Sequence, residues 1–376
     1  MGDARSNRLD YINAVRGIAI LMVIMLHVSS AVKGLPEVFS YMCGKGAFGV
    51  QLFFVASAFT LFLSYTNRIK KEGNLTNRNF FIRRFARISP MYYLAAIVYS
   101  VICYYIPAYN DGKPLVLWKV LANIFYLNGF VPGAVNYLPP GGWSVGVEMV
   151  FYCCVPFLFT RIKNIKNAVW WFAGFAAGGV ILKLLIRYLL IRLNIDYQRP
   201  ESWFLYFWFP NQAPVFLLGI VLFFAIQKYK VKNRQQAYAG LAISTLLLLI
   251  FTYFRRDIDP NNVIPEHTIV PVFFAVNIYL LSQFPARIFD NAVTRFFGEI
   301  SFSMYLVHFI VVYILAYYFP LPVNPFAQYL VLLGLTLLIS GAISKLTYHM
   351  VELKGIAFGD RYIKHRALKP ELDPGI

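Results

Sequence analysis

The chain has 376 residues, of which 59% are hydrophobic, 18% aromatic and only 14% charged, and its mean hydropathy is +0.58. A water-soluble domain of this composition would expose large apolar patches, so the composition predicts an all-α polytopic membrane protein instead. The net charge of +18 suggests a nucleic-acid partner until the basic residues are placed on the topology, where most of them flank the apolar runs on one side. We therefore expect no nucleic-acid partner.

Apolar runs long enough to cross a bilayer predict about ten transmembrane helices in a single integral-membrane domain, residues 1–376. The expected core covers about 8–350, and 351–376 form a basic tail. Because Lys and Arg gather in alternate loops, the positive-inside rule places both termini in the cytoplasm. Residues 1–10 are polar and no convincing cleavage site follows the first run, so we expect it to remain as the first helix. The runs are 12–32, 47–66, 90–106, 143–160, 169–191, 213–227, 238–254, 268–284, 300–319 and 326–350.

The first apolar run carries Arg16 and His27, two groups that are costly to place in hydrocarbon. Ionisable residues inside a spanning helix face the protein interior and often mark a reaction centre or a pathway. At 100° per residue, their eleven-residue separation returns both side chains to within about 20° of one face, about 16 Å apart along the axis. We expect one internal track with a fixed cation and a proton acceptor on it.

The inner loop after the second run is the most basic segment, with seven basic residues and one acidic residue between Arg68 and Arg87. Its end, Phe80 to Pro90, alternates apolar and basic residues as an interfacial amphipathic helix does. Arg84 and Arg87, with Arg83 alongside, are spaced so that their guanidinium groups share one side of a helical turn and can hold phosphate oxygens. Contact with lipid phosphates is the alternative interpretation.

Two outer segments are candidates for a rim over the site. Residues 107–142 are rich in Pro and Gly, which is typical of a loop or broken helix and allows a re-entrant segment. Residues 193–212 form a second candidate rim.

The four cysteines have no metal-ligand spacing; Cys43 and Cys103 could pair in an oxidising compartment or serve as buried apolar residues. We expect no metal.

The fourth run begins with Trp143 and Ser144 and carries Glu148 at about the depth predicted for His27. A buried carboxylate beside an imidazole can orient it and stabilise the imidazolium, so we expect Glu148 to support His27 as a general base. The alternative is a hydrogen bond that only joins two helices. Residues 142–146 also fit the pattern G-x-S-x-G of a serine hydrolase, but they open a membrane helix rather than a strand-turn-helix, which favours Ser144 as a cap or a substrate contact.

The ninth run places Tyr305 and His308 where they could line the same track and contact substrate. A core histidine bonded to a helix carbonyl is an equally good interpretation of His308. Lys183, Arg187 and Arg192, at the outer end of the fifth run, are expected either to reach the lipid interface or to meet an anionic acceptor.

Taken in order, these segments resemble the acyltransferase 3 family of bacterial membrane O-acyltransferases over residues 8–350. The resemblance rests on Arg16 and His27 in the first run and on short matching segments elsewhere. These segments are residues 48–55, 83–90, 143–148 and 305–308.

The resemblance implies transfer of an acyl group, usually acetyl from acetyl-coenzyme A, to a hydroxyl of an extracytoplasmic envelope glycan or lipid-linked sugar. It implies His27 as the catalytic base with Glu148 as its partner, and a donor site at Arg16, Arg83, Arg84 and Arg87. We assign Trp143, Ser144, Tyr305 and His308 to substrate binding and expect a multi-pass location in the bacterial cytoplasmic membrane, in contact with membrane lipids. A transporter or lipid flippase that uses the buried charges as a translocation path is the alternative.

Overall fold

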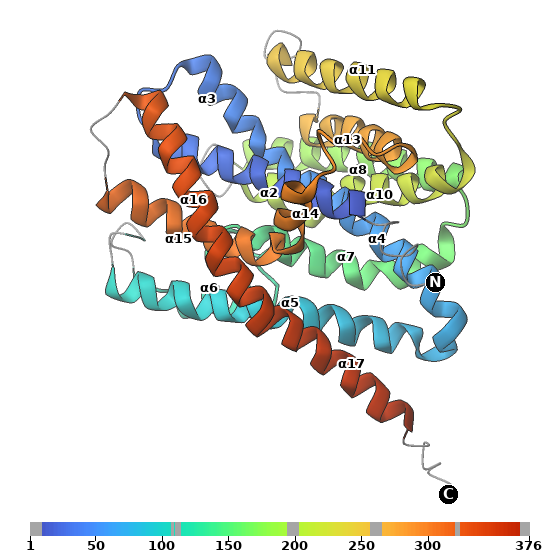
Figure 1. The fold of residues 1–376 in the computed structure, drawn as a ribbon. Helices are drawn as coiled ribbons and strands as arrows, with labels where there is room; N and C mark the ends of the chain where they lie inside the picture. The colour runs from blue at the N-terminus through green and yellow to red at the C-terminus, as the bar shows by residue number, and fades with distance from the viewer. Residues whose placement is uncertain are drawn as a thin grey trace, which may run out of the picture.

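The computed structural model describes residues 10–106, 109, 114–193, 203–255, 265–319 and 324–368, and this part of the chain is helical throughout, with no strand (Figure 1). Long helices run roughly side by side, and α16 and α17 cross them obliquely. The helices are α2 (Asp10–Ala31), α3 (Glu37–Gly44), α4 (Gly49–Glu72), α5 (Thr76–Tyr105), α6 (Leu117–Ile124), α7 (Gly142–Arg161), α8 (Ile165–Arg192), α9 (Trp203–Phe207), α10 (Phe209–Lys228), α11 (Arg234–Tyr253), α13 (Glu266–Gln283), α14 (Ala292–Glu299), α15 (Ser301–Tyr318), α16 (Pro325–Thr347) and α17 (Leu353–Leu368).

Each of the ten predicted apolar runs coincides with a helix, so the all-α prediction is confirmed. By length and composition, eight stretches of the described residues can cross a membrane, and one of them, Glu37–Tyr105, contains both α4 and α5. The number ten and the cytoplasmic placement of both termini stay predictions.

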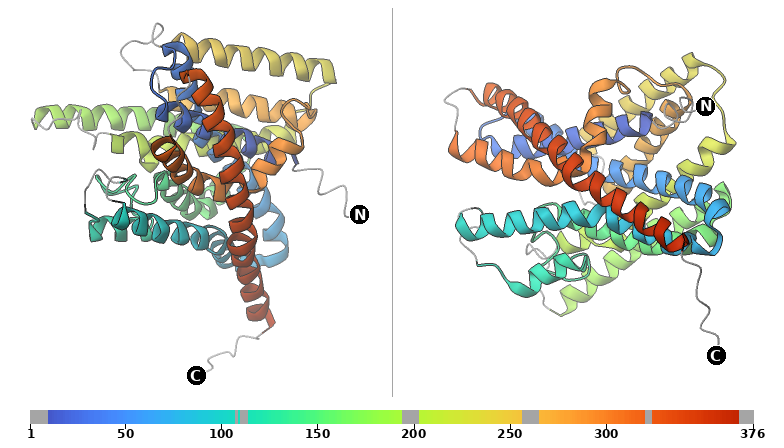
Figure 2. Two further views of the ribbon diagram at one scale, coloured as in Figure 1. Left: turned by 60° about the vertical axis from the view of Figure 1, so that its left-hand side comes forward. Right: turned by 60° about the horizontal axis from the view of Figure 1, so that its bottom comes forward.

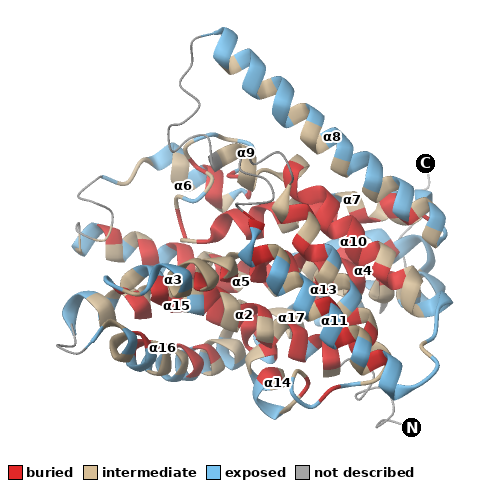
Figure 3. Cartoon of the chain, turned by 90° about the horizontal axis from the view of Figure 1, so that it is seen from above, coloured by how far each residue is buried: buried red, intermediate tan, exposed pale blue. Residues whose placement is uncertain are grey.

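The centre of the molecule is formed by α2, which packs against α4, α14, α15 and α16. The two further views in Figure 2 show the same central position of α2 among the other helices. At the opposite extreme, α8 lies at the edge, and Figure 3 shows most of its length as exposed or half-exposed. Because α2 is enclosed on several sides, Arg16 and His27 project into protein rather than into lipid.

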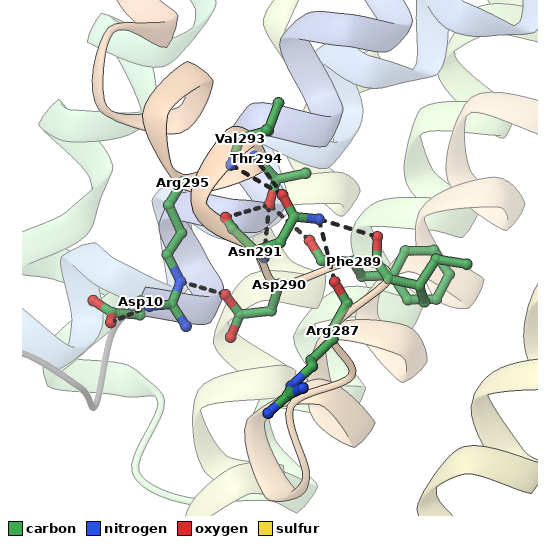
Figure 4. Close-up of polar contacts among 9 residues, drawn as sticks. Asp10, Arg287, Phe289, Asp290, Asn291, Val293, Thr294 and Arg295 are labelled. Carbon is green, nitrogen blue, oxygen red and sulfur yellow. Dashed lines mark hydrogen bonds and ion pairs between the residues drawn. The ribbon is translucent and has the colours of Figure 1, made fainter.

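The N-terminal half of α2 is held by α14 at a very close crossing. A Cβ atom added to Gly298 would lie 1.7 Å from the main-chain oxygen of Asn13, so only glycine fits. Beside the crossing, Arg295 forms ion pairs with Asp10 at 2.8 Å and with Asp290 at 2.6 Å (Figure 4). The hydrogen bond from Arg295 to Asp290 raises the pKa of the arginine. The contact determines where the first turns of α2, including Arg16, lie in the bundle.

One expectation about the basic segments is corrected. The residues before Pro90 do not form a separate interfacial helix, because α4 continues to Glu72 and α5 begins at Thr76, so Arg83 to Arg87 belong to one 30-residue helix with Pro90 inside it. The first part of the predicted basic tail, 351–376, is helical and packed. A π-helical turn, Tyr348–Glu352, leads into α17, which packs on α5; Gly355 allows this because an added Cβ would lie 2.4 Å from the Ala86 oxygen.

Part of the first predicted rim is described and packs back onto the bundle. After α6, the Tyr126 hydroxyl donates to Ser89 on α5 at 2.9 Å, and Asn136 accepts a hydrogen bond from the Gly141 amide at 2.8 Å. Residues 107, 108 and 110–113 of this rim, and 194–202 of the second, lie outside the described residues.

Cys43 and Cys103 are both buried free thiols, so the disulfide alternative is wrong.

Candidate active site

Three cavities lie in sequence along α2. The proximal cavity, near the Asp10 end, is lined by Asn13 and Arg16. The central cavity is also lined by Arg16. The distal cavity, at the Ala31 end, is lined by His27. Because α2 is one continuous helix, Arg16 and His27 project from the same face of it, as their spacing predicts. They nevertheless line different cavities.

The central cavity combines charged, hydroxyl and aromatic side chains from five helices. Its polar lining comes from α2, α4, α5, α7 and α15. These residues are Arg16, Ser57, Thr60, Arg84, Arg87, Ser144, Glu148, Tyr152, Ser301 and Tyr305. Polar groups that converge on a partly aromatic cavity are typical of a small-molecule site.

Three arginines lie where the proximal and central cavities adjoin. Arg16 and Arg87 line both cavities, and Arg84 lines the central one. No ion pair within the described part of the chain includes any of the three. The Nε atom of Arg84 is buried without a hydrogen-bond partner among the described residues, and its guanidinium lies over the rings of Phe80 and Tyr152. Half-buried guanidinium groups that make no ion pair are suited to bind an anion.

Arg83 does not join this group. It forms an ion pair with Glu72 at 2.8 Å, and it does not line the central or the proximal cavity. Helical periodicity does not explain this, because Arg83 and Arg87 are four residues apart and point within about 40° of each other. The ion pair with Glu72 is what holds the Arg83 side chain away from the two cavities. The assignment of Arg83 to the donor site is therefore not supported by its position.

Glu148 is held inside the central cavity by two hydroxyl donors. Tyr152, one turn further along α7, donates to Oε1 of Glu148 at 2.8 Å, and Ser57 on α4 donates to the same oxygen. The expected pairing of Glu148 with His27 is thus not what the structure shows, because the carboxylate belongs to the central cavity and the imidazole to the distal one. Equal depth on two helices did not bring the side chains together.

The start of α7 contacts α15 through a small hydrogen-bond cluster. The Tyr305 hydroxyl donates to the Gly141 carbonyl oxygen at 3.0 Å, and the Ser144 hydroxyl donates to Tyr305, also at 3.0 Å. Gly141 has φ +74°, and a Cβ there would lie 2.8 Å from the Tyr305 hydroxyl, so glycine is required on both counts. Trp143 instead packs against Phe54 and Phe207 and does not line the central cavity, which places it in the hydrophobic core.

Aromatic and imidazole rings separate the central cavity from the distal one. Tyr305 lines the former, Phe309 lines the latter, and His308 is fully buried between them. The His27 ring lies 5.2 Å from that of His308 and 4.4 Å from that of Phe309. Because the His308 Nδ1 atom lies 3.0 Å from the Met304 carbonyl oxygen, that nitrogen carries the proton. The single open track expected from the sequence is divided here.

Sequence reasoning missed three residues of these cavities. Ser57 and Tyr152 bind the Glu148 carboxylate, and Glu352, at the end of the π-helical turn, lines the proximal cavity. The spacing of Tyr152, four residues after Glu148, is a signal that places both on one helix face. Nothing in the local sequence around Glu352 distinguishes it from a residue of an exposed tail. No group of three or more His, Cys, Asp or Glu side chains in the described ranges could hold a metal ion.

The chain matches an acyltransferase family model and several known proteins. A family model described as an acyltransferase domain, the acyltransferase 3 family, matches residues 9–345. No solved structure matches the chain.

Individual relatives are distant but cover most of the chain. A Staphylococcus aureus (strain COL) protein named "Putative O-acetyltransferase" is 25% identical over 374 residues, which is 93% of this chain and 58% of the relative. The peptidoglycan O-acetyltransferase OatA of Listeria monocytogenes is 25% identical over 79% of this chain and 48% of its own length. The acyltransferase MdmB of Streptomyces mycarofaciens is 24% identical over 81% of this chain and 79% of its own length. The chain thus spans about half the length of the first two relatives.

Proposed function

The chain belongs to the acyltransferase 3 family, and from that premise we propose that it is a membrane O-acyltransferase. In this proposal an acyl group, most simply acetyl, moves from acetyl-coenzyme A at the Asp10 end of α2 to a hydroxyl of an envelope glycan or lipid-linked sugar at the Ala31 end. Relatives named as O-acetyltransferases support the reaction class. The proposal places the Asp10 end in the cytoplasm and the protein in the bacterial cytoplasmic membrane.

The observation that carries the donor assignment is the absence of ion pairs, within the described chain, at Arg16, Arg84 and Arg87. A buried cation normally has a carboxylate partner, because taking charge out of water costs several kcal/mol. Three guanidinium groups that make no ion pair and lie where two cavities adjoin are suited to a polyanion such as the phosphates of coenzyme A. Two of the three face both cavities, so a ligand can keep its phosphates proximal while a thinner part enters the central cavity.

The central cavity suits the uncharged arm of the donor. The hydroxyl oxygens of Ser57, Tyr152 and Ser144 lie along its wall, and although each hydroxyl donates within the protein, its oxygen can still accept a hydrogen bond from an amide N–H of pantetheine. Phosphates cannot enter the apolar interior cheaply, whereas a slender arm can, so the acyl group crosses the protein without the nucleotide crossing.

We assign the proton transfer to His27. The acceptor hydroxyl attacks the thioester carbon, the C–O bond forms as the C–S bond breaks, and His27 passes the hydroxyl proton to the departing thiolate. Because the His308 and Phe309 rings contact His27, and His27 does not line the central cavity, these side chains must move aside for a thioester in the central cavity to reach His27. The acceptor sugar would occupy the distal cavity, whose walls include Tyr109, Tyr313 and Tyr317.

The test is a transfer assay with purified protein in liposomes, using acetyl-coenzyme A labelled in the acetyl group. Release of coenzyme A together with label on a glycan or lipid-linked sugar supports the proposal. Exchange of an unmodified solute across the bilayer without release of coenzyme A would instead support the transporter alternative. Mass spectrometry of surface glycans from cells with and without the gene identifies the acceptor.

A further inference from the structure

A carboxylate lies buried beside the proposed phosphate site. Glu352 ends the π-helical turn Tyr348–Glu352 and is only 2% exposed. Ser303 on α15 donates a hydrogen bond to its carboxylate. Interruptions of this kind between α-helices are rare and frequently occur at functional sites. The turn therefore carries an acid into the protein interior at the junction of α16 and α17.

Glu352 faces the two arginines that connect the proximal and central cavities. It lines the proximal cavity with Arg16 and Arg87, and both guanidinium groups are near enough to act electrostatically on its carboxylate. Neither arginine forms an ion pair with Glu352 within 4.0 Å. The carboxylate is thus close to the cations, but Ser303 holds it back from direct contact.

The other acid of the same cavity is differently placed. Glu299 is paired with Lys345 at 2.9 Å, and its side chain is 42% exposed. Its charge is therefore already compensated and screened by solvent. Of the two acids that line this cavity, Glu352 is the one that makes no ion pair among the described residues, and its charge acts on Arg16 and Arg87. Glu148, on the side of the central cavity, also acts on Arg16.

We propose that Glu352 is an internal competitor of the donor phosphates: it partly compensates Arg16 and Arg87 in the empty protein and opposes phosphate binding, so that coenzyme A is released after transfer. This inference rests on the proposed function, because it takes the donor to be a coenzyme A thioester. Without Glu352, the arginines would hold both acetyl-coenzyme A and the coenzyme A left after transfer more firmly, so release of coenzyme A would be slower. Glu352 is thus a positioning residue that sets donor affinity and product release.

The measurement is binding of coenzyme A to the purified full-length protein in nanodiscs, by isothermal titration calorimetry. Glu352→Gln keeps the size of the side chain and an oxygen that accepts the Ser303 hydrogen bond, but it removes the negative charge. We expect roughly five- to tenfold tighter binding, because a like charge near the phosphates is lost from a site of reduced dielectric. The gain should shrink at high salt. Glu299→Gln, the matched control from the same cavity, should bind coenzyme A as the wild type does.

A second variant tests the opposite sign. Ser303→Ala leaves Glu352 charged but removes its hydrogen-bond donor, so the carboxylate is free to approach Arg16 and Arg87. We expect weaker binding of coenzyme A by a few-fold. In the acyl-transfer assay, Glu352→Gln should lower kcat, because release of coenzyme A becomes slower.

The outcomes separate the two proposals. If the wild type does not bind coenzyme A, the donor assignment fails, and this inference fails with it. If the wild type binds coenzyme A but Glu352→Gln binds it equally or more weakly, only the role given to Glu352 is wrong. Tighter binding by Ser303→Ala would also overturn that role, and this result is available even if Glu352→Gln does not fold.

Discussion

Replacing Arg84 by Met tests whether the charge of this residue contributes to donor binding or to the stability of the fold. The substitution keeps an unbranched apolar side chain in contact with Phe80 and Tyr152 but removes a guanidinium that has no ion-pair partner among the described residues. If the group is retained for phosphate binding, the variant should lose donor affinity without losing stability. Arg83→Met is the matched control, because Arg83 is the preceding residue of the same helix and is ion-paired.

The expected magnitudes follow from the surroundings of each arginine. A charge-assisted hydrogen bond to phosphate contributes about 1.5–3 kcal/mol, so Arg84→Met should weaken coenzyme A binding by about 10- to 150-fold. Its stability should stay within about 1 kcal/mol of the wild type, because lost cation–π contacts are offset by relief from burying an unpaired charge. Arg83→Met leaves Glu72 without the 2.8 Å partner and should cost about 1–2 kcal/mol of stability, with coenzyme A affinity unchanged.

The assay pairs calorimetric binding of coenzyme A with thermal unfolding of the same samples in detergent. The crossed pattern is the expected result: Arg84→Met is impaired in binding only, and Arg83→Met in stability only. If Arg84→Met binds coenzyme A like the wild type, the phosphate site proposed here does not exist. If Arg84→Met unfolds at a temperature several degrees below that of the wild type, Arg84 stabilises the fold even though it makes no ion pair.

Three further predictions follow from the described contacts. His27→Ala should abolish acyl transfer while coenzyme A binding remains within about twofold of wild type, since His27 lines the distal cavity; loss of both activities would contradict the separation of the cavities. Glu148→Ala should cost about 1–3 kcal/mol, because the Ser57 and Tyr152 hydroxyls lose their shared acceptor, as thermal unfolding in detergent will measure. Gly298→Ala should destabilise by at least about 1–3 kcal/mol because its Cβ would meet the Asn13 oxygen at 1.7 Å, whereas Gly334→Ala, with open space around it, should be neutral or slightly stabilising in the same assay.

Helix–helix geometry explains why these predictions depend on the structure. Depth along a membrane helix is readable from residue counts, so the sequence places His27 and Glu148 at similar levels. The direction in which a side chain points within the membrane plane depends on how its helix is rotated about its own axis and on which neighbouring helix it packs against. Glu148 turns to Ser57 on α4, and His27 faces His308 on α15, so residues at similar depth belong to separate cavities.

The sequence by itself determined the all-helical class, the positions of the ten apolar helices and the family. These properties depend on local composition and on short ordered motifs, which do not require knowledge of contacts. The spacing of Arg16 and His27 also predicted their common face on α2, because helical periodicity is a local property.

Only the tertiary structure decided which residues share a cavity. It separated Arg83 from Arg84 and Arg87 by pairing the first with Glu72, it placed Trp143 in the core, and it brought Glu352 from the expected tail to the arginines. Each of these outcomes depends on contacts between helices far apart in the chain, where small rotations decide whether a side chain meets a partner, a cavity or lipid. That information is distributed over all the packed faces at once, and no local pattern carries it.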